Sequence, residues 1–81
     1  MKKYQDFDEL ERLFFDDVLE VMEKKYGGNP LELMEGSTFF NRYLKDPVYV
    51  QHHPPVYWAD FIYEQHISSL SPTQLRHNSD N

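Results

Sequence analysis

Residues 52–66 read HHPPVYWADFIYEQH. This stretch holds three of the four histidines, the only tryptophan and three further aromatic residues of the chain. Proline is favoured in the first turn of a helix and disfavours helix immediately upstream, so Pro54-Pro55 predicts that a helix begins there. We expect this helix over residues 55–67. Four of its residues then share one face at helical spacing: Trp58, Phe61, Ile62 and Gln65.

The apolar face of this helix is interpreted as an anchor that fills the groove between the helices before it. Trp58 is the largest side chain on this face, and a buried aromatic residue removes ~150–250 Å² from water. Tyr57 and Tyr63 lie off the apolar face, and tyrosine is enriched at protein interfaces. We therefore predict these two tyrosines as partner-binding residues.

The clearest helix is predicted over residues 7–26. Its apolar residues recur every three to four positions, with Val21 alongside: Phe7, Leu10, Phe14, Val18 and Met22. Asp6 is expected as the N-cap, with Glu9 three residues later completing a capping box. Gly27-Gly28 is expected to end the helix, because glycine accepts the left-handed conformation there.

Residues 29–53 are predicted to form shorter elements. Asn29-Pro30 matches an N-cap followed by proline at the first helical position. Gly36-Ser37 favours a break, with Ser37 capping the next helix, although one helix continuing through Gly36 at a cost of ~1 kcal/mol is the alternative. Asp46-Pro47 ends this region, because a residue before proline avoids the helical conformation. Residues 48–53 are compatible with a strand, a turn or a short helix.

These elements predict an all-α fold, a small bundle of three to four helices. The chain has 81 residues, which suffices for one hydrophobic core and not two. We expect a single helical domain over residues 1–67 and a flexible polar tail over residues 68–81.

Negative charge is concentrated in the first predicted helix. The formal net charge is −6, and residues 6–23 contain eight acidic residues against Arg12 alone. Such a surface repels nucleic acid and anionic lipid and attracts basic partners. Direct nucleic-acid binding is therefore not expected, nor is membrane association, because no apolar run approaches the ~20 residues of a membrane span.

An apolar residue lies within the acidic side of this helix. Leu13 has carboxylates at helical spacing on all sides: Glu9, Asp16, Asp17 and Glu20. An apolar contact surrounded by charges that steer a basic partner is typical of protein interfaces. The simpler interpretation is a solvated helix face with one exposed leucine, which is common. We predict these five residues as the partner-binding site.

Catalytic and metal-binding patterns are weak. The candidate ligands for a metal are His52, His53, His66, Asp60 and Glu64, and they lack the spacings typical of zinc sites. A structural role for a histidine near Trp58 is favoured over metal binding. The chain has no cysteine, no Gly-x-Ser-x-Gly elbow and no glycine-rich phosphate loop. We therefore expect neither catalytic residues nor a cofactor.

The sequence favours a non-catalytic binding protein that regulates or inhibits a larger, basic-surfaced protein through its acidic first helix. Three alternatives stay open: a DNA mimic that inhibits a nucleic-acid-binding protein, a structural subunit of a larger assembly, and, least favoured, a metal-dependent enzyme. Self-association is also compatible with the broad apolar side of the first helix. The N-terminus has two lysines without a following apolar stretch, so no signal peptide is expected and the cytoplasm is the expected location.

Overall fold

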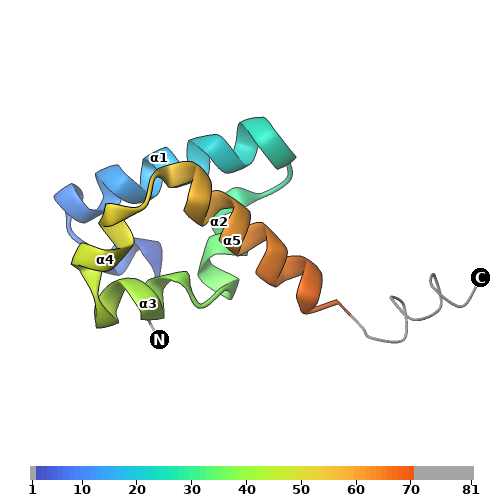
Figure 1. Ribbon diagram of the computed structural model, residues 1–81. Helices are drawn as coiled ribbons and strands as arrows, with labels where there is room; N and C mark the ends of the chain where they lie inside the picture. Colours follow the sequence, from blue (N-terminus) through green and yellow to red (C-terminus); the bar gives the residue numbers. More distant parts are fainter. Residues whose placement is uncertain (1, 71–81) are drawn as a thin grey trace, which may run out of the picture.

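The computed structural model describes residues 2–70, and this part of the chain is all-helical (Figure 1). The predicted fold class is confirmed, although the described residues form two long and three short α-helices rather than three or four. A 3₁₀ turn precedes them. The elements are η1 (Tyr4–Asp6), α1 (Glu9–Tyr26), α2 (Pro30–Gly36), α3 (Phe39–Lys45), α4 (Pro47–His52) and α5 (Pro55–Ser68). The predicted tail falls largely on residues 71–81, outside the described residues.

Helix α1 begins at Glu9, two residues later than predicted. Asp8 is the N-cap: its carboxylate accepts a hydrogen bond from the Glu11 amide at 2.8 Å, and the Glu11 carboxylate accepts one from the Asp8 amide at 3.1 Å. The prediction of Asp6 as N-cap, with Glu9 as its partner, was therefore wrong. Phe7 explains the shift, because it adopts an extended backbone and its side chain is only 3% exposed. The predicted end is confirmed, since Gly27 has a φ of 72°.

The buried side of α1 also differs from the prediction. Phe15, Val18 and Met22 are the fully buried residues of this helix, whereas Leu10 is 77% exposed. The predicted stripe was right for Val18 and Met22 and wrong for Leu10. Residue 15 lies about 140° from residue 10 around a helix with 3.6 residues per turn, so burying Phe15 turns Leu10 outward.

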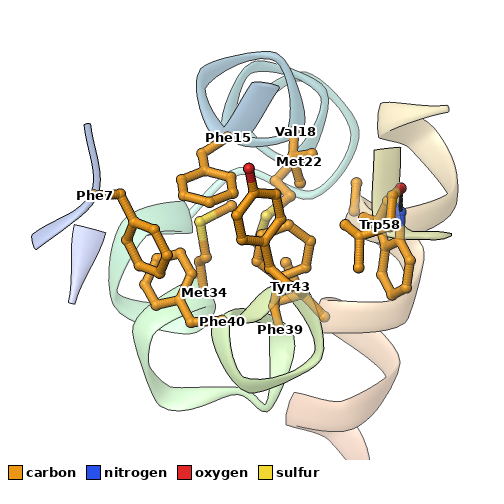
Figure 2. Packing of buried hydrophobic residues seen from close by; sticks show 12 residues of the cluster. Phe7, Phe15, Val18, Met22, Met34, Phe39, Phe40, Tyr43 and Trp58 are labelled. Carbon is orange, nitrogen blue, oxygen red and sulfur yellow. Dashed lines mark hydrogen bonds between the residues drawn. The ribbon is translucent and has the colours of Figure 1, made fainter. Parts of the chain in front are cut away.

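Aromatic rings fill one side of the core (Figure 2). Phe7 lies 4.9 Å from Phe15 and 4.8 Å from Phe40, and Phe15 lies 4.9 Å from Tyr43, measured between ring centroids. The Phe7–Phe15 and Phe15–Tyr43 pairs are edge-to-face, an arrangement that adds ~0.5–1.5 kcal/mol per pair beyond the burial of their area. This cluster joins the segment before α1 to helix α3.

The breaks between the short helices follow the predicted punctuation. The Asn29 side chain caps α2, and Pro30 occupies its first turn. The predicted break at Gly36-Ser37 is confirmed, although the N-cap of α3 is Thr38; the Ser37 hydroxyl accepts a hydrogen bond from the Phe39 amide at 3.1 Å. Residues 47–52 form a helix, so the strand alternative was wrong; the Asp46 carboxylate caps it by accepting from the Tyr49 amide at 3.0 Å.

Helix α5 is the predicted anchor and ends at Ser68, one residue beyond the prediction. It crosses α1, the helix it contacts most (Figure 1). Trp58 is 1% exposed, and its indole N–H donates a 2.6 Å hydrogen bond to the Val50 carbonyl. This bond satisfies the one polar atom of the indole, so the Trp58 side chain can be buried against α4 without an unpaired donor. Ile62 is also fully buried, whereas Phe61 is half-buried.

Candidate functional site

The acidic face of α1, defined as Glu9, Leu13, Asp16, Asp17 and Glu20, points into solvent. All five residues are exposed, and Leu13 is 58% exposed. Residues of an α-helix are about 100° apart around the axis, which places Leu13 nearly opposite the buried stripe of Phe15, Val18 and Met22. No other helix of the described chain therefore covers the centre of this face.

Leu10 enlarges the apolar part of this surface, and the sequence interpretation missed it by assigning Leu10 to the core. It precedes Leu13 by three residues, so the two side chains are neighbours on the helix. The signal was present in the sequence: Phe15, Val18 and Met22 have helical spacing as regular as that of the stripe containing Leu10. Two exposed leucines among carboxylates form a larger apolar contact than Leu13 alone.

Asp16 has a structural contact as well as a place on the acidic face. Its carboxylate accepts a hydrogen bond from the Tyr4 hydroxyl. This bond raises the pKa of the Tyr4 hydroxyl, because the neutral form is the one that donates. The Tyr4 amide donates to the Glu35 carboxylate at 3.1 Å, so η1 is attached to both α1 and α2.

The two tyrosines predicted as contact residues have different surroundings. Tyr63 stacks on Tyr26 with ring centroids 3.8 Å apart, so one face of its ring is covered within the chain. Tyr57 is 43% exposed and stacks on His53 at 4.4 Å. Both lie on α5, and neither belongs to the surface that contains Leu13.

The candidate metal ligands do not converge. His52 and His53 lie at the junction of α4 and α5, whereas His66 lies in the last turn of α5. Within residues 2–70, no three His, Asp or Glu side chains are grouped closely enough to hold a metal ion. His53 is the histidine near Trp58: its ring lies 6.0 Å from that of Trp58, and its Nδ1 is 3.3 Å from the Tyr49 carbonyl oxygen.

Asp60 instead connects the two long helices. Its Oδ1 accepts hydrogen bonds from Lys25 Nζ at 2.8 Å and from the Tyr26 hydroxyl at 2.5 Å. The bond from Lys25, followed by that from Tyr26, holds the pKa of the Asp60 carboxyl below its ordinary value. The same bonds raise the pKa values of Lys25 and Tyr26. Asp60 therefore acts in the packing of α1 against α5.

Comparisons with known protein families, with curated proteins and with solved structures find no match for this chain. No helix among residues 2–70 combines the length and apolar character needed to span a bilayer. One exposed feature of the described chain is a helix face with two leucines and four carboxylates.

Proposed function

We propose that this chain is a non-catalytic binding protein that regulates or inhibits a larger, basic-surfaced protein through the acidic face of α1. The observation that carries the proposal is the position of Leu13, 58% exposed among Glu9, Asp17 and Glu20 on the side of α1 that no other described helix covers. Leu10, 77% exposed, extends the apolar contact.

The two kinds of side chain have separate roles in this proposal. The leucines supply apolar area that is buried on binding, where a few central residues contribute most of the affinity. The carboxylates raise the rate of encounter with a positively charged surface and exclude acidic partners. Such a division predicts that charge substitutions act mainly on association and that leucine substitutions act mainly on dissociation.

The test begins with isolation of the partner on immobilised protein from the native host. Association rates of the purified pair are then measured at about 50 mM and about 300 mM salt, where the Debye length changes from ~14 to ~6 Å. The charge variant is Glu9→Gln/Asp17→Asn/Glu20→Gln. It omits Asp16, because that carboxylate accepts the Tyr4 hydrogen bond.

The proposal predicts that the charge variant associates more slowly at low salt and has a flatter salt dependence. Glu64→Gln, which removes an exposed carboxylate on α5 outside the acidic face, serves as the control and should behave as the parent protein. Unchanged association in the charge variant contradicts the proposal. If duplex DNA competes with this chain for the same partner, the result supports the alternative in which the carboxylates mimic phosphates.

A further inference from the structure

A groove runs along one edge of the acidic face, between α1 and the beginning of α2. Its volume is about 380 Å³, and it is shallow and widely open to solvent. The floor is apolar and is formed by Leu19 of α1 with Pro30 and Leu31 of α2. The wall on the α1 side carries Glu20 and Glu23, which are both exposed.

The apolar floor is accessible from solvent. Leu31 is 37% exposed, and Leu19 is partly buried against the core. The wall is acidic because Glu20 and Glu23 are three residues apart and therefore neighbours along one edge of α1. The groove thus combines an apolar surface, formed by residues of both α1 and α2, with negative charge on its α1 side.

The two glutamates are open to a cation from outside the chain. Asp16 also lines the groove, but it accepts the Tyr4 hydrogen bond. Glu20 has one ion pair, with Lys24 at 3.9 Å, and the two side chains are 67% and 76% exposed. Exposed pairs of this kind contribute ~0–1 kcal/mol, so a cation with additional contacts can displace Lys24.

We infer that this groove receives an arginine or lysine side chain of the basic partner. The aliphatic stem lies on Leu19 and Leu31, and the cationic end reaches Glu20 and Glu23. Long basic side chains combine an apolar stem with a charged head in this way. The inference rests on the proposed function, because it identifies the partner group that the edge of the acidic face contacts.

The groove favours a basic side chain over a bare metal ion. Calcium and magnesium need six or more oxygen ligands, whereas more than a third of the lining residues here are apolar. Arginine suits the site better than lysine, since its planar guanidinium presents several donors to two carboxylates and is more weakly hydrated. The Asn29 side chain caps α2, and Glu32 in its first turn offsets the positive end of that short helix.

The probe is an N-acetylated, C-amidated tri-arginine peptide, titrated into the full-length ¹⁵N-labelled chain at low salt and followed by amide chemical shifts. We expect the largest shifts at Leu19, Glu20, Glu23 and Leu31. Glu20→Gln/Glu23→Gln should raise the Kd of the peptide about fivefold or more. The matched control, Glu9→Gln/Asp17→Asn, removes the same charge outside the groove and should change the Kd less than twofold.

A third variant, Leu31→Ser, tests the apolar floor and should weaken the peptide about twofold to fivefold without unfolding the chain, because Leu31 is partly exposed. Equal weakening by both charge variants, or largest shifts at Glu9 and Asp17, overturns the groove as a specific site. The proposed function survives that result if partner binding still depends on Leu13. If the peptide shows no preference for the groove and partner binding does not depend on Leu13, both proposals are contradicted.

Discussion

Helices α1 and α5 differ in what their outward carboxylates contact. On α5, Asp60 accepts hydrogen bonds from Lys25 and Tyr26 and so holds the two long helices together. On α1, Glu9 and Asp17 are exposed beside the exposed Leu10 and Leu13. Acidic residues of similar appearance in the sequence therefore differ in surroundings: Asp60 contacts another helix, whereas Glu9 and Asp17 face solvent.

Substitutions on the buried and the exposed side of α1 should differ most in their effect on the free energy of unfolding. Phe15→Ala should lower the free energy of unfolding by about 3–5 kcal/mol, because it leaves a cavity in the aromatic cluster. Leu10→Ala should change it by less than about 0.5 kcal/mol, since that side chain is 77% exposed. Guanidinium denaturation measures both, and a larger loss for Leu10→Ala would contradict the assignment of the core face.

The second effect concerns the anchor on α5. Trp58→Phe should cost about 1–3 kcal/mol, because it reduces packing and leaves the buried Val50 carbonyl without its indole donor. Tyr49→Phe, which removes an exposed hydroxyl nearby, is the matched control and should be nearly neutral. Thermal unfolding of the two variants provides the measurement. Equal stability of Trp58→Phe and the parent would show that the indole hydrogen bond contributes nothing.

The third effect tests where α1 begins. Asp8→Ala removes the N-cap and should cost about 1 kcal/mol. Asp6→Ala affects only the three-residue η1 turn, where the Asp6 carboxylate accepts from the Lys3 amide at 2.9 Å, and should cost less. Urea denaturation distinguishes them. The reverse order would support the start that the sequence pattern first predicted.

The smallest effect tests the contact between α1 and α5 by pH. The pKa of Asp60 is lowered in the folded chain, so its contribution to stability is present above the ordinary value of ~3.9 and is lost as pH falls through the folded value. Asp60→Asn should therefore be less stable than the parent at pH 6, and the difference should shrink toward pH 2. Glu64→Gln, which removes an exposed carboxylate one turn later on α5, is the control and should be as stable as the parent at pH 6.

Much of the fold was predictable because its boundaries depend on local residues. Gly27-Gly28, Asn29-Pro30 and Pro54-Pro55 each mark the end or start of a helix where the structure has one. The register of α1 was not predictable in the same way. Leu10 and Phe15 both fit a helical stripe, and the choice depends on Phe7 and Phe40, which lie in other segments and meet Phe15 only in the folded chain.

The candidate site was partly predictable for a related reason. Leu13 and its carboxylates are neighbours within one helix, so helical spacing alone places them together. The contact of Asp60 with Lys25 joins residues 35 positions apart, and no local pattern indicates it. The groove between α1 and α2 depends on how the chain turns at Gly27-Gly28, which brings Leu31 beside Leu19.

Whether the partner binds at Leu13 is tested by comparing two exposed apolar sites on different helices. Leu13 on α1 is 58% exposed, and Val48 on α4 is 79% exposed. The dissociation rate of the purified partner should rise at least about tenfold for Leu13→Asp, equivalent to ~1.4 kcal/mol, and stay within about twofold of the parent for Val48→Asp. Unchanged dissociation for Leu13→Asp together with faster dissociation for Val48→Asp would place the binding surface on α4 and contradict the account.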